Sequence, residues 1–350
     1  MSVDAELKVT QGDFTLDAAL QVADNEICVL VGPNGAGKTT MLRALAGLLA
    51  IDEGTIRLDG TVVDSPGDNQ FVPPERRSVG VVFQEFLLFP NLNARDNVAF
   101  GLRERGMRKA AARELAGAWL ERVGLGDKST ARPHELSSGQ AQRVALARAL
   151  APEPSLLLMD EPLAALDVQT RAELRRDLRT ALDGTPGARI LVTHDPIDAL
   201  TLAHRVVILE NGAIAQTGSP AEVVAQPRSQ YVADLVGINL FRGEAEGHVV
   251  RLAAGEQLTV ADEHSGSVVA LIAPRAVAVH RTKPSGSARN VWAGTVAGIE
   301  RIGDRVRLRI AGPVPIVAEI TPESVTALEL RDGDPVWAAV KATEIDVSPT

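Results

Sequence analysis

The octapeptide at residues 32–39, Gly-Pro-Asn-Gly-Ala-Gly-Lys-Thr, constrains the fold of this 350-residue chain more than any other stretch. It matches the phosphate-loop pattern G-x-x-x-x-G-K-[ST]. A continuous apolar run at 27–31 precedes it, as expected of a strand buried on both faces of a parallel sheet. Apolar residues then recur at helical spacing through 41–49. The order of strand, glycine loop and helix predicts an α/β core whose loop binds phosphate.

The chemistry of such a loop follows from its residue types. Glycines let the backbone wrap closely around a phosphate chain and aim N–H groups at it, and the next helix adds the positive end of its dipole. Lys38 is expected to neutralise β- and γ-phosphate charge, and the Thr39 hydroxyl to ligate Mg²⁺. A turn that binds nothing is the alternative, which the flanking strand and helix disfavour. The predicted nucleotide-binding residues are Gly32, Pro33, Asn34, Gly35, Ala36, Gly37, Lys38, Thr39 and Thr40.

Composition narrows the function classes. No run approaches the ~20 apolar residues that a membrane-spanning helix needs, and no basic-then-apolar signal pattern opens the sequence. We therefore expect a cytoplasmic protein whose membrane role comes through a partner. The net charge of −9 and the aromatic content of 3% argue against nucleic acid as a ligand. The one cysteine, Cys28, is expected to be a small core residue.

The pattern of apolar and charged residues changes at two places and divides the chain. Residues 1–235 alternate apolar strands with amphipathic helices, which predicts a nucleotide-binding α/β domain with a largely parallel sheet. Within it, about 88–150 is predicted to be a helical subdomain, because the stretch from Arg95 to Arg122 is charged and Ala-rich with apolar residues at helical intervals. We interpret 236–285 as a linker and the first β half of a tail, and 286–350 as a small OB-like β domain. The two halves of the tail end in similar stretches, which suggests an internal duplication: 270–279 and 337–347.

A second apolar run, at 156–159, ends in two adjacent acids. Asp160 at the end of this strand would bring a carboxylate to the metal beside the phosphate loop, directly or through water. Glu161 follows it and is placed to polarise an attacking water. A plain solvated turn is the alternative, and it fits poorly with two acids after an apolar strand. The pair predicts nucleotide hydrolysis.

The stretch Leu-Ser-Ser-Gly-Gln at 136–140 opens an Ala-rich helix. Ser137 and Gln140 have the spacing of a capping box, which is a structural role. The same Ser–Gly helix N-terminus would also make a second anion site suited to a γ-phosphate. The stretch resembles the signature sequence of ABC-type ATPases, Leu-Ser-Gly-Gly-Gln in most members, with Ser138 in place of the first glycine. The resemblance to this family covers residues 1 to about 235.

Further segments resemble ABC motifs in the family's order. Gln84, after the run 81–83, resembles the glutamine that senses the γ-phosphate and the metal. Asp167 in Ala-Leu-Asp resembles the dimer-contacting aspartate, and His194 in Thr-His-Asp resembles the switch histidine. Family members usually stack adenine on an aromatic residue of the first strands. Phe14 is the candidate here, and ordinary core packing is its alternative role.

The resemblance implies an ATPase that works as a homodimer with ATP and Mg²⁺. In such enzymes the signature helix of one subunit covers ATP held by the phosphate loop of the other. It implies two integral-membrane permease subunits, docked near 85–97 at the cytoplasmic face of the plasma membrane, and a periplasmic or lipoprotein substrate-binding protein. The residues it places across the dimer are Ser137, Ser138, Gly139 and Gln140. The implied metal ligands are Thr39, Gln84 and Asp160, and the implied catalytic residues are Glu161, His194 and Gln84.

The tail resembles the Mop module, a small OB-like β fold that binds molybdate or tungstate, over about 286–347. The matching segments are 287–290 (Ser-Ala-Arg-Asn), 318–324, 333–336 and 340–342. A tetrahedral oxyanion needs a small concave site of N–H donors and hydroxyls. The residues expected to form it are Ser287, Arg289, Asn290 and Lys341. A β-barrel that stabilises the dimer and binds nothing is the alternative.

The segment 71–77, Phe-Val-Pro-Pro-Glu-Arg-Arg, leads to Gln84 and resembles importer ATPases for inorganic anions, molybdate among them. Together with the tail it implies the ATPase subunit of a bacterial ABC importer, with molybdate or tungstate as the favoured cargo. Sulfate, thiosulfate, ferric ion and sugars are the alternative cargoes. A soluble ABC ATPase that acts on nucleic acid or ribosomes is the alternative class. Such proteins usually carry coiled-coil or basic insertions or tandem cassettes, and the sequence has none.

Overall fold

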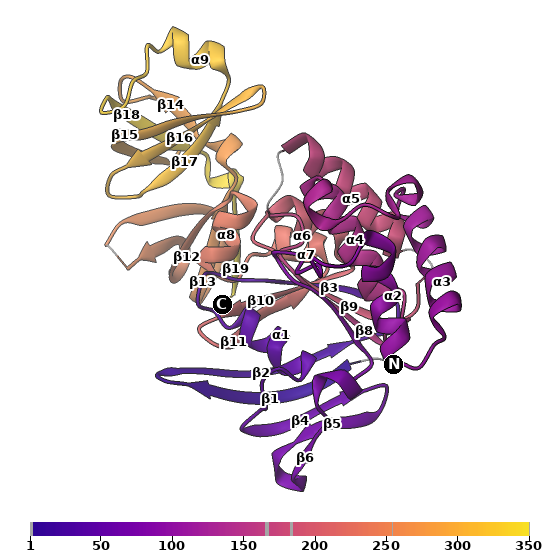
Figure 1. Cartoon of the computed structure of the whole chain (residues 1–350). Helices are drawn as coiled ribbons and strands as arrows, with labels where there is room; N and C mark the ends of the chain where they lie inside the picture. Colours follow the sequence, from indigo (N-terminus) through magenta and orange to yellow (C-terminus); the bar gives the residue numbers. More distant parts are fainter. Residues whose placement is uncertain (1–2, 165–167, 183–184, 254, 350) are drawn as a thin grey trace. The chain divides into compact units, whose positions relative to one another are not determined.

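The chain forms two compact units, Met1–Val223 and Val224–Thr350, in a computed structural model (Figure 1). The structure describes residues 3–164, 168–182, 185–253 and 255–349. The first unit mixes helices and strands, and in the second, strands predominate beside short helices. This agrees with the predicted α/β core followed by a β domain. Of the helices described, none is long and apolar enough to cross a bilayer.

A largely parallel sheet forms the centre of the first unit. Its order is β11-β10-β3-β9-β8-β7, and only the β10–β11 pair is antiparallel. Every residue of β3 and β9 is buried, which explains their continuous apolar sequences. Because the strands run parallel, the carboxyl ends of β3, β9, β8 and β7 lie along one edge. The bounds are β3 (Ile27–Val31), β7 (Val79–Val82), β8 (Leu156–Asp160), β9 (Ala188–Val192), β10 (Arg205–Glu210) and β11 (Ala213–Gly218).

A second, antiparallel sheet and the helix α1 (Lys38–Ala46) share the core of this unit. Met41 and Leu45 of α1 are fully buried, and the same apolar cluster holds Leu16 of β2 and Leu158 of β8. The helix therefore packs between the two sheets. The sheet order is β2-β1-β4-β5-β6. Its strands are β1 (Val3–Gln11), β2 (Phe14–Val22), β4 (Glu53–Leu58), β5 (Thr61–Ser65) and β6 (Gln70–Phe71).

Arg77 ties the second sheet to α1. Its buried guanidinium donates to the carbonyl oxygens of Ala44 at 2.8 Å and Val63 at 3.3 Å, and it pairs with the Asp64 carboxylate at 3.4 Å. A buried charge is tolerated only when it is paired and hydrogen-bonded, and this one is both. The same arginine belongs to the segment that suggested an anion importer.

Helices fill the segment between β7 and β8. Asn93 begins the first of them by accepting a hydrogen bond from the backbone N–H of Asp96 at 2.8 Å. The helices of this segment are α2 (Ala94–Glu104), α3 (Lys109–Arg122) and α4 (Ser138–Leu150). Those that follow in this unit are α5 (Val168–Leu182), α6 (Pro196–Leu202) and α7 (Pro220–Ala225), whose last two residues lie in the second unit.

The second unit packs two antiparallel sheets around one apolar core. The sheet orders are β12-β13-β19 and β14-β18-β15-β16-β17. Trp292, Leu308 and Ile272 belong to the shared core. The elements are α8 (Gln230–Val236), β12 (Asn239–Leu252), β13 (Gln257–Ile272), β14 (Ala278–His280), β15 (Asn290–Ile302), β16 (Arg305–Ala311), β17 (Ile316–Ile320), α9 (Pro322–Ala327), β18 (Pro335–Val340) and β19 (Ile345–Pro349).

The two halves of this unit exchange strands. β19, at the end of the second half, pairs with β13 of the first, while β14, at the end of the first half, pairs with β18 of the second. Two asparagines, one in each half, also bond the backbone of the other half. The amide of Asn239 bonds the N–H and C=O of Val317, and the amide of Asn290 bonds the N–H and C=O of Thr259. Each half therefore completes a sheet of the other.

Candidate nucleotide site

The phosphate loop follows β3 and is held in a tight backbone conformation. A Cβ atom on Gly32 would lie 2.0 Å from the carbonyl oxygen of Leu209, so a larger residue has no room there. Gly37 caps α1 with a φ of 105°, a region that side chains disfavour. These two glycines explain why the motif needs glycine at both ends. The exposed stretch between them includes Asn34 and Gly35.

Lys38 closes this loop on itself. Its side chain is 9% exposed, and the ammonium donates to the carbonyl oxygens of Gly32 at 2.7 Å and Pro33 at 2.9 Å. Burial lowers the pKa of Lys38, and the charges of Glu161 and Asp160 oppose that shift. The lysine is thus a nearly buried cation between the loop and the two acids. Thr39, next in sequence, is exposed, and Thr40 is half-buried.

Phe14 lies against the phosphate loop. A Cβ on Gly37 would meet the tip of the Phe14 ring at 2.9 Å. The half-buried ring also packs against the apolar core of the first unit. Phe14 is therefore both next to the phosphate loop and part of the core packing.

The two acids follow β8. Burial raises the pKa of Asp160, Glu161 raises it further, and the cations Lys38 and Arg43 oppose the rise. Glu161 has a φ of 46°, which is uncommon for a residue with a side chain. Its backbone N–H donates to the carbonyl oxygen of Val192 at 3.0 Å, so the turn after β8 is fastened to the end of β9. Residues held this way cluster at functional sites.

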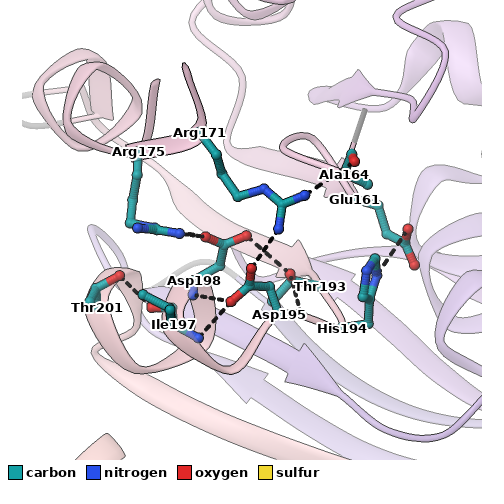
Figure 2. A network of polar contacts seen from close by, with 10 residues as sticks. All are labelled: Glu161, Ala164, Arg171, Arg175, Thr193, His194, Asp195, Ile197, Asp198 and Thr201. Carbon is teal, nitrogen blue, oxygen red and sulfur yellow. Dashed lines mark hydrogen bonds and ion pairs between the residues drawn. The ribbon is translucent and has the colours of Figure 1, made fainter. Parts of the chain in front are cut away.

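Gln84 and His194 converge on one oxygen of Glu161. The Gln84 amide donates to Oε2 at 3.4 Å, and Nδ1 of His194 lies 3.2 Å from the same atom (Figure 2). The three residues come from loops after β7, β8 and β9, which are neighbours in the parallel sheet. The sheet edge therefore brings together Gln84, the predicted γ-phosphate sensor, Glu161, predicted to orient water, and His194, the predicted switch histidine.

The signature segment, residues 136–140, begins α4 and, among the described residues, is not bonded to the phosphate loop. Ser137 and Gln140 form the expected capping box at the start of α4: Ser137 Oγ accepts from Gln140 N–H at 3.3 Å, and Gln140 Oε1 accepts from Ser137 N–H at 3.0 Å. Ser137 and Ser138 are exposed, and Gly139 is half-exposed. Within the described residues, no hydrogen bond or ion pair joins this segment to residues 32–39. The predicted Asp167 lies outside the described residues.

The predicted oxyanion residues are only partly gathered. Ser287 and Lys341 line a hollow in the second unit, together with Arg275, His280 and the carboxylate of Glu344. Arg289 is exposed but is not among its lining residues. The buried side chain of Asn290 is engaged by the Thr259 backbone, as described above. Of the four predicted residues, Ser287 and Lys341 therefore lie at the hollow, and Arg289 and Asn290 do not line it.

Sequence reasoning missed the residues that support the glutamine loop. The Arg148 guanidinium, on α4, donates to the carbonyl oxygens of Phe86 at 2.8 Å and Leu87 at 2.7 Å, both of which have a positive φ. The fully buried Asn97 amide bonds both backbone polar groups of Phe89. A polar residue on the apolar face of α2 was the available signal for Asn97. No local pattern pointed to Arg148.

Comparison with known proteins agrees with this geometry. A family profile described as ABC transporter matches residues 16–164, and one described as TOBE domain matches residues 286–347. The chain is 39% identical to the molybdenum import ATP-binding protein ModC of Mycobacterium tuberculosis (strain CDC 1551 / Oshkosh), over 98% of this chain and 97% of that protein. It is also 39% identical to the sulfate/thiosulfate import ATP-binding protein CysA 2 of Chromobacterium violaceum, over 97% of this chain and 92% of that protein.

A solved structure shows the same core. It is the dimeric, post-hydrolysis state of the ATP-binding cassette MJ0796 bound to ADP and phosphate. The TM-score is 0.54 at 29% identity, with 62% of this chain and 98% of that chain covered. The phosphate loop, the two acids and the family matches all agree on ATP hydrolysis. The chain belongs to the ABC transporter family, as an ATP-hydrolysing importer subunit with a C-terminal TOBE domain.

Proposed function

We propose that this chain hydrolyses ATP to drive the import of molybdate, with tungstate as an equivalent cargo. The observation that carries this choice is the hollow in the second unit, where Arg275 and Lys341 offer positive charge and Ser287 offers a hydroxyl, beside His280 and the carboxylate of Glu344. Such a set suits a small tetrahedral oxyanion. The similarity to a molybdenum import protein over nearly the whole chain supports it. The equally similar sulfate/thiosulfate protein makes sulfate the second candidate.

The residues of the nucleotide site fit Mg²⁺. The Thr39 hydroxyl, the Asp160 carboxylate and the Gln84 amide oxygen are the hard oxygen donors that this ion accepts. Burial and the neighbouring Glu161 raise the pKa of Asp160, so a cation there would relieve the repulsion between the two acids. When bound, Mg²⁺ would neutralise charge on the phosphates of ATP.

The protein's own groups then divide the work of hydrolysis. Lys38 and the backbone N–H groups of the loop bind the phosphates. Glu161 accepts a hydrogen bond from the attacking water and orients it. His194 and Gln84, both within 3.4 Å of the Glu161 carboxylate, hold that group and report on the γ-phosphate. This arrangement supplies positioning and charge stabilisation, which are the main contributions in phosphoryl transfer.

A homodimer would complete the site. The exposed N-terminus of α4 begins with Ser137, Ser138, Gly139 and Gln140. The capping box uses the N–H groups of Ser137 and Gln140, and the first-turn N–H groups of Ser138 and Gly139 are suited to a γ-phosphate. Because no hydrogen bond or ion pair joins this N-terminus to its own phosphate loop among the described residues, we propose that it covers ATP on a second copy. Asp167 would add a contact across the same interface. The dimeric cassette structure supports this proposal.

The permease would dock beside the glutamine loop. Leu87, Phe89 and Phe100 expose apolar surface there, and the rings of Phe89 and Phe100 are 4.4 Å apart. Exposed apolar side chains beside a nucleotide-sensing residue form a surface that is suited to bind a segment of a permease subunit. We propose two integral-membrane permease subunits, which would place the chain at the cytoplasmic face of the plasma membrane. A periplasmic or lipoprotein binding protein would deliver the anion to them.

The cargo can be tested by calorimetry on the full chain. The exchanged strands rule out a fragment of residues 286–350, because β18 and β19 would lose β14 and β13 as partners. Molybdate, tungstate and sulfate are titrated separately. We expect heat from molybdate and tungstate, and little from sulfate. Tighter binding of sulfate would favour the second candidate, and no heat from any anion at millimolar concentration would remove the support for an oxyanion cargo.

A matched pair of variants locates the binding. Lys341→Ala removes a cation that lines the hollow, and we expect the heat of molybdate binding to disappear. Lys283→Ala removes a cation from the same unit that lies over the Trp337 ring, 5.5 Å from its centroid, and not at the hollow. We expect this variant to bind as the parent does. Equal loss in both would indicate a nonspecific charge effect.

A further inference from the structure

Two arginines of α5 hold the segment that carries His194 (Figure 2). Arg171 pairs with the Asp195 carboxylate at 2.7 Å, and Arg175 pairs with the Asp198 carboxylate at 2.5 Å. Both aspartates lie just beyond His194, at the start of α6. The four side chains are largely buried, so these pairs are better shielded from water than surface ion pairs.

Asp195 fixes the backbone on both sides of itself. Its Oδ1 accepts from the N–H of Ile197 at 2.7 Å and caps α6, while its own N–H donates to Thr193 Oγ1 at 3.1 Å. His194 is the residue between Thr193 and Asp195. Its backbone therefore has little freedom, and the direction of the imidazole depends on where Asp195 is held.

Arg171 also reaches the segment that follows Glu161. Its second terminal nitrogen donates to the carbonyl oxygen of Ala164 at 3.3 Å, and the N–H of Ala164 donates to the carbonyl oxygen of Glu161 at 3.2 Å. One guanidinium thus bridges the turn of the proposed water-orienting acid and the turn of the proposed switch histidine. The planar fork of arginine suits this double contact, and lysine could not reproduce it.

We propose that Arg171 is a positioning residue, which sets the 3.2 Å contact between His194 and Glu161 by clamping Asp195 and Ala164 together. The proposal rests on the catalytic roles proposed above for Glu161 and His194. Arg171 touches neither side chain in Figure 2, so its effect on turnover passes through the two backbone turns. Loss of the clamp should disturb the geometry of hydrolysis and leave the phosphate loop intact.

The first test compares Arg171→Ala with Arg179→Ala. Arg179 lies two turns further along α5 and donates to the carbonyl oxygen of Thr201, near the end of α6, so it offers the same chemical change away from His194. We expect Arg171→Ala to lower kcat on the order of 10- to 100-fold with little change in the KM for ATP. Arg179→Ala should keep nearly the parent kcat. An unchanged kcat in folded Arg171→Ala would overturn the proposal.

The second test combines Arg171→Ala with His194→Ala. If Arg171 acts through His194, the double variant should be no slower than His194→Ala alone, because the clamp then has nothing left to position. Losses that multiply would show an independent role and overturn the proposal. If His194→Ala and Glu161→Gln both keep parent activity, the proposed catalytic roles fail instead, which separates the two failures.

A conservative variant covers the case in which Arg171→Ala does not fold. Arg171→Lys keeps a positive charge beside Asp195 but cannot bond Ala164 at the same time. We expect a kcat between those of the parent and Arg171→Ala, with an unchanged thermal midpoint. A parent-like kcat in Arg171→Lys would show that charge alone suffices and that the bridge to Ala164 has no role.

Discussion

His194 and Glu161 meet at the ends of two adjacent parallel strands, with Nδ1 of the imidazole 3.2 Å from Oε2 of the carboxylate. The strand register accounts for the meeting. Asp160 is paired with Val192, so the residues that follow on β8 and β9 leave the sheet side by side. The sheet therefore brings the two turns side by side, and the proposed Arg171 clamp then sets how their side chains meet.

Glu161→Gln should keep ATP binding and nearly abolish turnover. The amide has almost the same shape and can still accept a hydrogen bond from Gln84, but it cannot act as a base toward water. We expect a fall in kcat of at least about 100-fold, within the range for loss of a general base. Gel filtration with ATP and Mg²⁺ should show an accumulated dimer. Turnover near the parent rate would show that another group orients the water.

Lys38→Ala should lose nucleotide affinity. The variant removes the cation that faces both acids and the loop, so the charge of the phosphates would go uncompensated. We expect the Kd for ATP to rise on the order of 100-fold, or about 2.7 kcal/mol. Lys8 is an exposed lysine paired with Glu53, and Lys8→Ala is the matched control. We expect this control to bind ATP normally. Equal affinity in both variants would refute the role of Lys38.

The sequence was informative where a function needs a local pattern. The loop after β3, the acids after β8 and His194 after β9 each follow a short apolar run, and parallel packing then brings their ends together. It was silent on Arg148 and Arg171, and it placed Asn290 in the oxyanion site, because contacts such as Asn290 with Thr259 and Arg171 with Asp195 join residues that are distant in the chain. Arg148 bonds the carbonyl of Phe86, a residue 62 positions away, and no spacing rule encodes such a contact. The strand exchange in the tail was hidden for the same reason, although the repeated endings hinted at it.

Asn97→Ala should destabilise the protein and loosen the glutamine loop. The fully buried amide donates to the carbonyls of Phe89, Leu92 and Asn93, and accepts from the Phe89 N–H. Alanine removes the side-chain partner of the Phe89 N–H and of the Leu92 carbonyl, while the carbonyls of Phe89 and Asn93 keep a backbone donor, and we expect the loss to cost about 3 kcal/mol. Urea unfolding followed by circular dichroism measures the change. Asn91→Ala, at an exposed position nearby, should be within about 0.5 kcal/mol of the parent.

Cys28 gives a prediction about pH. Burial raises the pKa of this thiol to about 12, with Arg205 opposing the rise and Glu26 adding to it. In the unfolded chain the thiol would titrate near the ordinary value of about 8.5. Above that pH the unfolded state loses a proton that the folded state keeps, so stability falls as pH rises. Between pH 7 and pH 10 we expect this group to remove about 2 kcal/mol from the free energy of unfolding.

The comparison of the parent with Cys28→Ala isolates this effect. Lysine, tyrosine and arginine side chains titrate in both proteins, so their contribution cancels in the difference between the two pH profiles. Cys28→Ala should start slightly less stable at pH 7, because a buried sulfur is lost, and the gap should close or reverse by pH 10. Folded parent protein should also resist alkylation by iodoacetamide at pH 8.5, since the thiol is fully buried in β3. Parallel pH profiles with rapid alkylation would mean that β3 is accessible to water.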